Sequence, residues 1–122
     1  EYSNALSTGS GFALWSVFSK NKDDIIFTSP IVLGADALGE RGKRAEIVGK
    51  EAAEKLEKEI NSNAPVDGHT SDNLIPFIGL FGGKIKASEI TTHALTNIYT
   101  VESFLGNKFN IDKVNKIISS PI

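Results

Sequence analysis

The sequence predicts an α+β fold, in which a small mixed sheet has helices packed on one face. Three observations support this class. Apolar residues recur every three or four positions over 45–60, which is the period of an amphipathic helix. An apolar and aromatic run over 12–18 follows a Ser/Gly-rich turn and is typical of a strand. Helical and strand patterns are mixed along a 122-residue chain without an internal repeat, which favours one domain built from both.

The first half of the chain is expected to hold two strands and one long helix. After the strand over 12–18 and a polar turn, a second strand is predicted over 25–38, with Pro30 interrupting it at an edge or a bulge. The helix has its apolar stripe at Ala45, Val48, Ala52, Leu56 and Ile60. Elsewhere on this helix, Glu54 and Lys58 form one of several i,i+4 pairs in the favourable order, which predicts a solvated face.

A shorter helix and a short strand are expected next. The helix is predicted over 70–80, with Asp67 or Thr70 as its cap and a glycine pair after its last residue. Pro76 lies inside it and is expected to kink it. The strand is predicted over 84–90, where apolar and polar residues alternate.

The last predicted helix carries His93, one of only two histidines, in its first turn. Thr91 or Thr92 can cap this helix, Gly106 ends it, and a final short strand follows over 107–111. A helix N-terminus favours neutral imidazole and offers N–H donors to a phosphate, so His93 is a candidate nucleophile toward an anionic centre. The simpler interpretation, a polar residue beside a cap, is the commoner case when the residues are considered alone.

Five polar side chains at the start of the helix over 70–80 are of a kind that can bind a nucleotide. An aromatic ring, two hydroxyls, a carboxylate and an amide can stack on a base and hydrogen-bond its edge or its ribose. These residues are His69, Thr70, Ser71, Asp72 and Asn73. The alternative is a capped helix with a polar first turn. No metal site is predicted from the residues, because there is no cysteine and no histidine or carboxylate shows ligand spacing.

Composition excludes several classes of protein. The chain has no cysteine, which excludes disulfides and a cysteine nucleophile and fits a reducing compartment, so we expect a cytoplasmic protein. No apolar run approaches the roughly 20 residues of a membrane span. The net charge of −2 gives no broad electrostatic footprint for nucleic acid. The absence of methionine, even at position 1, suggests a fragment of a longer protein.

A glycine-rich stretch over 34–44 follows a predicted strand and precedes a helix, as a phosphate-binding loop does. It lacks the Lys-Ser/Thr pair of that motif, and no hydroxyl is placed to hold Mg²⁺. We therefore predict an ordinary turn.

Four stretches in this order resemble the C-terminal part of the RNA 3′-terminal phosphate cyclase family. They read STGSGFALW, VLGADALGERGKRAEIVGKEAAEKL, APVDGHTSDNLIPFIGL and SEITTHALTNIYTVESFLGNKF. The resemblance implies that residues 1–122 are one C-terminal fragment, the last repeat of the cyclase's large domain. In it, residues 1–24 are the end of the preceding region with the first strand, and residues 25–112 are the repeat that carries the nucleophile.

The resemblance also implies a chemistry. Family members use ATP with Mg²⁺ or Mn²⁺ to convert an RNA 3′-phosphate end into a 2′,3′-cyclic phosphodiester through a covalent histidine–AMP intermediate. The nucleophilic histidine of the family falls on His93, and the adenylate-binding run falls on residues 69–73, with His69 in the place of a ring that stacks on adenine. Asn73 stands where the family usually has glutamine, which shortens the reach of that amide by one methylene.

The resemblance implies partners as well. The arginines that hold phosphates in the family belong to its N-terminal part, and the only arginines here are Arg41 and Arg44. We therefore expect this chain to be inert alone, to act with the missing N-terminal part of the same protein on RNA with a 3′-phosphate end, and to self-associate through an exposed apolar face. No membrane partner is expected. The alternative function is a non-catalytic scaffold of the same fold in RNA processing or ribosome biogenesis.

Overall fold

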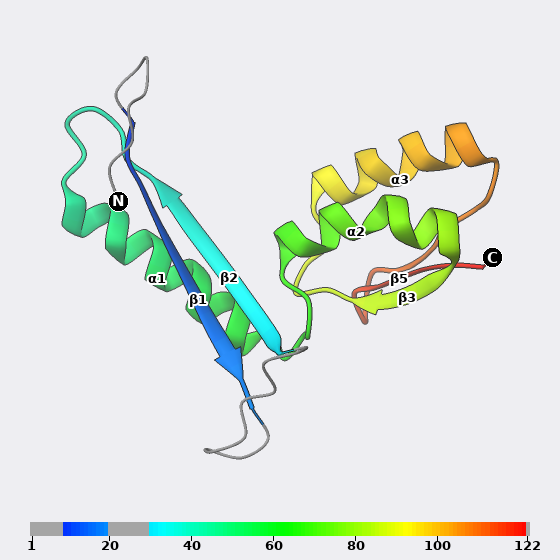
Figure 1. Ribbon diagram of the computed structural model, residues 1–122, viewed down its shortest axis with the longest axis horizontal. Coiled ribbons are helices and arrows are strands. Elements are labelled where there is room, and N and C mark those ends of the chain that lie inside the picture. Colours follow the sequence, from blue (N-terminus) through cyan, green and yellow to red (C-terminus); the bar gives the residue numbers. More distant parts are fainter. Residues whose placement is uncertain (1–8, 20–29, 122) are drawn as a thin grey trace.

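The computed structural model describes residues 9–19 and 30–121 of the chain. Its elements are β1 (Gly11–Phe18), β2 (Ile31–Leu38), α1 (Ala45–Asn61), α2 (Gly68–Phe81), β3 (Gly83–Lys86), α3 (Thr92–Leu105), β4 (Asn110–Asp112) and β5 (Ile117–Ser120). Figure 1 shows two groups of elements, β1 and β2 with α1, and α2 and α3 with the remaining strands. The α+β class is confirmed. The part of the second predicted strand over 25–29 lies outside the described residues, and β2 begins directly after Pro30.

The described strands form two antiparallel sheets rather than the one mixed sheet expected. β1 pairs with β2 along its whole length, from Gly11 opposite Leu38 to Phe18 opposite Ile31. The other sheet has the order β3-β5-β4. A single isolated parallel bridge, Val66 with Ala87, lies where the chain passes between the two groups. This bridge does not extend into a ladder, so the two sheets stay separate within the described residues. The β1–β2 sheet packs against α1, and the three-stranded sheet packs against α2 and α3.

The α1 group forms its own small core. Val48 and Ala52 from the predicted stripe are buried against Ala37 of β2, with Leu14 of β1 packed beside them. The charged pairs of α1 differ from the expectation, because Glu54 pairs with Lys50 at 3.6 Å. Lys58 instead reaches Glu89, at 2.8 Å, and thereby ties α1 to the segment before α3. A tertiary partner has replaced the local i,i+4 partner.

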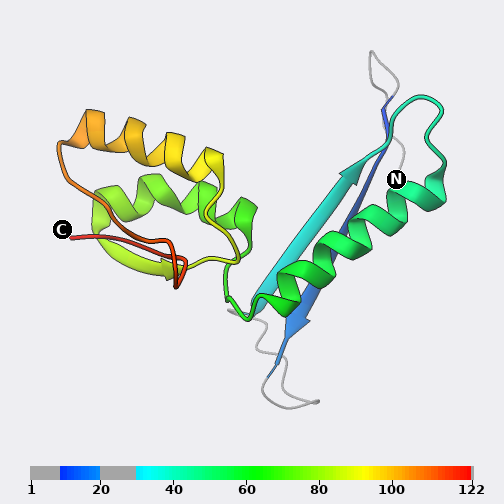
Figure 2. The same ribbon diagram turned by 180° about the vertical axis from the view of Figure 1, so that it is seen from behind.

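The second core lies between α2, α3 and the three-stranded sheet. Ile75, Ala94, Ile98 and Ile118 form its buried centre. Ile118 belongs to β5, which is the central strand of the sheet although the sequence analysis left this tail unassigned. The sheet therefore extends past residue 112, the expected end of the repeat. Figure 2 shows the same arrangement from behind, with β5 lying along β3.

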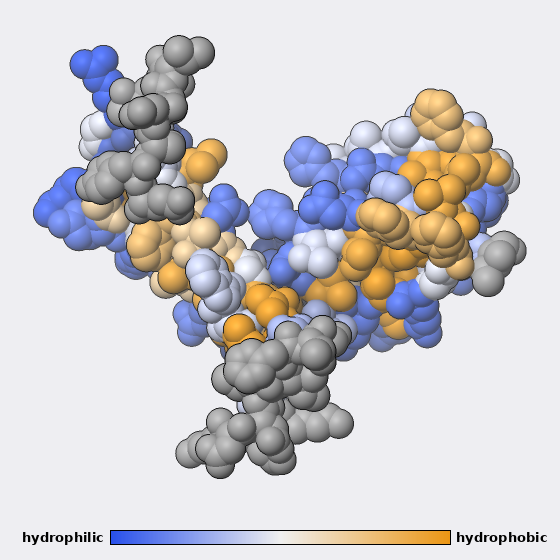
Figure 3. All heavy atoms as spheres, viewed as in Figure 1, coloured by the Kyte–Doolittle hydropathy of each residue, from blue (hydrophilic) through white to orange (hydrophobic). Residues whose placement is uncertain are grey.

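Apolar side chains are exposed on both groups. Figure 3 shows a hydrophobic area over the α2 and α3 group, where large side chains remain open to solvent. They include Phe77, Leu80, Phe81, Tyr99 and Phe104. On the α1 group, Trp15 and Leu38 are exposed on the hairpin. Self-association through such faces stays a prediction. In the two described stretches, none of the helices has both the length and the hydropathy that crossing a bilayer requires.

Candidate functional site

His93 lies in the first turn of α3, as predicted. The helix begins after Thr91, whose Oγ1 accepts a hydrogen bond from the Ala94 N–H at 2.8 Å. Ala94 is fully buried and His93 is exposed. At the other end, Gly106 adopts the left-handed conformation with φ 71° and closes the helix.

The start of α2 is held by Asp67, the first of the two predicted caps. Its Oδ1 accepts from the Thr70 N–H at 2.7 Å, and its Oδ2 accepts from the Gly34 N–H of β2 at 3.1 Å. Asp67 is buried, so one carboxylate caps the helix and fastens it to the α1 group. His69 is exposed in the first turn of α2, with Nε2 3.5 Å from Asp36 Oδ1.

The two histidines line one hollow of about 510 Å³. In both ribbon views α2 and α3 lie side by side, with their N-terminal ends toward the β1–β2 group. The hollow is lined by Glu59, Gly68, His69, Asp72, Glu89, Ile90, Thr91, Thr92 and His93. It therefore lies where two helix N-termini present free N–H groups, the arrangement that favours a bound anion.

The five residues of the predicted nucleotide-binding run do not all lie on one exposed surface. His69, Thr70 and Asn73 are exposed, whereas Ser71 is fully buried and its Oγ has no hydrogen-bond partner among the described residues. Thr70 lines a neighbouring hollow with Trp15 and His69. Asn73 donates its Nδ2–H to the His69 carbonyl at 3.0 Å, so it braces the turn that carries the ring.

Asp72 connects the two helices. Its Oδ1 accepts the Thr91 hydroxyl at 2.5 Å, and its main-chain carbonyl accepts from Asn97 Nδ2 of α3 at 3.0 Å. This carbonyl is available because Pro76, four residues on, has no N–H to donate to it. α2 continues through Pro76, and a side chain of the neighbouring helix replaces the missing hydrogen bond. The residue pattern predicted a kink at Pro76, and in the structure the carbonyl that Pro76 leaves open forms a contact with α3.

The charge of the hollow comes from carboxylates. Glu59, Asp72 and Glu89 line it, and no lysine or arginine is among its lining residues. Glu89 accepts a hydrogen bond from Lys58 Nζ, and that bond together with the carboxylate charge raises the pKa of Lys58. Glu59 has a buried Oε2 without a hydrogen-bond partner among the described residues. Sequence analysis missed both glutamates, because on a charged helix or loop they resemble solvated residues.

This donor and acceptor set is of a kind that can bind part of a nucleotide. An exposed imidazole ring, hydroxyls and carboxylates suit a base and a ribose, and the helix N-termini suit one phosphate. The set does not fit a triphosphate, whose charge would face carboxylates without a lining cation. It does not fit a divalent metal either, since the described part of the chain contains no group of three His, Asp or Glu side chains that could hold one.

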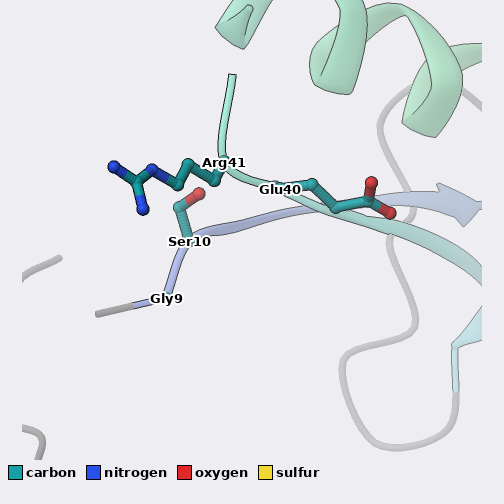
Figure 4. Close-up of a pocket in the computed structure, with 5 residues that line it drawn as sticks. Gly9, Ser10, Glu40 and Arg41 are labelled. Atoms are coloured by element: carbon teal, nitrogen blue, oxygen red, sulfur yellow. The ribbon is translucent and has the colours of Figure 1, made fainter. Parts of the chain in front are cut away.

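The glycine-rich stretch over 34–44 is divided in the structure: residues 34–38 belong to β2, and the predicted turn is confined to the residues between β2 and α1. After β2 the Gly39 N–H donates to the Ser10 carbonyl at 2.9 Å, and the Lys43 N–H donates to the Glu40 carbonyl at 3.0 Å. Figure 4 shows the hollow beside this turn, where the side chains of Glu40 and Arg41 point away from each other. They do not converge on a common ligand, and the turn connects the end of β2 to the start of α1.

Comparisons with known proteins agree with the resemblance. A family model described as RNA 3′-terminal phosphate cyclase matches residues 6–111. A curated protein named RNA 3′-terminal phosphate cyclase from Thermococcus onnurineus is 44% identical over 112 residues, which is 92% of this chain and 30% of that protein. Proteins of the same name from Pyrococcus abyssi and Saccharolobus solfataricus are 45% and 47% identical, over 92% and 87% of this chain and 30% and 28% of their own lengths. The chain thus spans about 30% of the length of such relatives.

Proposed function

The chain belongs to the RNA 3′-terminal phosphate cyclase family, and on that premise we propose that it supplies the nucleophile for ATP-dependent cyclisation of an RNA 3′-phosphate end. The reaction is of the ligase class. The observation that carries the proposal is the placement of His93 in the first turn of α3, lining one hollow with the ring of His69. A neutral imidazole beside free helix N–H groups is suited to attack on a phosphate.

The proposed sequence has three transfers. A ring nitrogen of His93 attacks the α-phosphorus of ATP, which forms a P–N bond and breaks the bond to pyrophosphate. An oxygen of the RNA 3′-phosphate then attacks the same phosphorus, so that AMP leaves the imidazole and joins the RNA end. Finally the neighbouring ribose 2′-hydroxyl attacks the RNA phosphate, loses its proton and expels AMP, leaving the 2′,3′-cyclic phosphodiester.

We propose unequal roles for the five residues of the adenylate run. His69 stacks on the base, and Thr70 and Asn73 stand on the exposed side of the same turn. Ser71 is fully buried, so we assign it a role in packing and not in contact with the nucleotide. Asp72 accepts a hydrogen bond from the Thr91 hydroxyl. Removing the ring should therefore weaken nucleotide binding without removing the nucleophile.

We propose that the cations and the Mg²⁺ or Mn²⁺ ligands come from another part of a complete cyclase, N-terminal to the segment that this sequence represents. The hollow has only carboxylates as charged lining groups beside the histidines, and a triphosphate needs positive charge to reach its transition state. On this proposal the 122-residue chain alone is inactive on RNA. Cyclisation by the isolated chain at the rate of a complete cyclase would overturn this assignment.

The test uses a complete cyclase chain that contains this segment, incubated with ATP labelled at the α-phosphate and Mn²⁺ or Mg²⁺. We expect an acid-labile protein label that His93→Ala abolishes and that the matched control His69→Ala retains at saturating ATP. Label on the His93→Ala protein would place the nucleophile elsewhere. A complete chain that takes up no label would support the alternative function, a non-catalytic scaffold in RNA processing or ribosome biogenesis.

A further inference from the structure

Asp72 lines the hollow with the two histidines and forms one hydrogen bond to the cap of α3 and one to α3 itself. The Thr91 hydroxyl has one proton, and its oxygen already accepts the Ala94 N–H at 2.8 Å as the helix cap. That proton goes to Asp72 Oδ1, 2.5 Å away. The carboxylate therefore fixes the rotation of the hydroxyl, which in turn aims its lone pair at the first turn of α3.

The same residue holds α3 a second time through its main chain. The Asp72 carbonyl accepts from Asn97 Nδ2 at 3.0 Å, a site left open by Pro76. Ala94 and Ile98 of α3 are buried against Ile75 of α2 in the same core. His93 consequently stands between a cap held by Asp72 and a buried alanine, so its backbone has little freedom and its ring is presented to the hollow.

From this geometry we infer that Asp72 is a positioning residue, which holds the Thr91 cap and so orients His93 for attack, instead of being a direct ligand of the nucleotide. The inference rests on the proposed function of His93. A charged carboxylate facing the phosphates of a nucleotide would oppose their binding, whereas a carboxylate that accepts a hydrogen bond from the Thr91 hydroxyl stabilises the cap. Asp72 also lies three residues after His69 on the same helix, so one turn of α2 carries both the base-stacking ring and the hold on the nucleophile.

The test separates positioning from binding in the complete cyclase chain. Asp72→Ala and Thr91→Val each break the contact, and Thr91→Ser keeps the hydroxyl as the matched control. We expect both breaking variants to slow single-turnover His93 labelling by about 10-fold to 100-fold, the loss that accompanies a misplaced reacting group. The ATP concentration for half-maximal rate should change less than twofold, and Thr91→Ser should stay near the wild-type rate.

The double variant provides the decisive comparison. Because both substitutions break one chain of contacts, Asp72→Ala with Thr91→Val should be no slower than the slower single variant. Hydrogen exchange of the peptide over 92–97 should speed up in both single variants, and more in Thr91→Val, which also removes the acceptor of the Ala94 N–H. Multiplied rate losses, or an Asp72→Ala variant that needs far more ATP while Thr91→Val behaves as wild type, would overturn the inference. If the wild-type chain takes up no label, the proposed function has failed, and exchange alone then decides whether the Asp72–Thr91 contact holds the turn.

Discussion

The substitution Gly79→Ala tests how closely α2 packs on α3. It adds one methyl group, whose packing cost and helix-propensity gain act on the free energy of unfolding with opposite sign. Gly79 is buried in α2, and a Cβ there would collide with Val101 Cγ1 of α3 and lie 3.3 Å from Phe109 Cζ. Val101 is β-branched within a helix and has one strongly preferred rotamer, so it cannot turn aside. The two helices would have to move apart.

The magnitude follows from two opposing terms. Replacing glycine by alanine inside a helix stabilises the folded state by about 1 kcal/mol. Overpacking a close contact costs about 1–3 kcal/mol, and the rigid neighbour places this case near the upper end. Gly79→Ala should therefore lower the free energy of unfolding by about 2 kcal/mol.

Gly49 is the matched control, because it lies inside α1 and nothing stands within 4 Å of a Cβ added to it. Gly49→Ala should gain the propensity term alone, about 1 kcal/mol. Urea unfolding of the two variants, followed by helical circular dichroism, measures both free energies against wild type. A Gly79→Ala chain as stable as the Gly49→Ala chain would refute the close packing of the two helices.

Two further predictions concern single carboxylates. Asp67→Ala should lower the free energy of unfolding by about 2 kcal/mol or more, because it leaves the Thr70 and Gly34 N–H groups without their acceptor. Asp67→Ser keeps one cap oxygen and should lose less stability in urea unfolding. Equal losses in the two variants would contradict the capping role. The N–H of Phe109 donates to Glu102 at 2.8 Å and, as the largest cause, lowers the pKa of that carboxyl below its usual 4.5. Since the pKa is lower in the folded state than in the unfolded chain, this carboxylate contributes stability above pH 4.5 that is lost as pH falls through the folded value. Glu102→Gln should thus lessen the loss of stability on acidification below pH 4.5, and an unchanged acid dependence would argue against the contact.

Helix ends were predictable because their causes are local. Thr91 and Asp67 cap helices within three residues of themselves, and Gly106 adopts the left-handed conformation that few other residues adopt easily. The placement of His93 in a first turn follows from the same neighbours. These features depend on residues adjacent in the chain, so the residue pattern contains the information that decides them.

The contacts that build the site depend on distant residues. His69 and His93 share a hollow only because α2 and α3 pack with their N-terminal ends together, and Ser71, in the same turn as His69, is fully buried in the folded chain. The α1 lysine Lys58 pairs with Glu89 across 31 residues, where a local partner was expected.

Local residue patterns were enough to predict the α+β class, most of the helix and strand positions and the candidate nucleophile, because periodicity and caps act over a few residues. The tertiary structure decided that the strands divide into two sheets, with the unassigned tail at the centre of one, because strand pairing depends on which edges meet in space. It also decided that Asp72 faces Thr91. The polar run reads equally well as a ligand surface or as a helix contact, and only the position of α3 distinguishes the two.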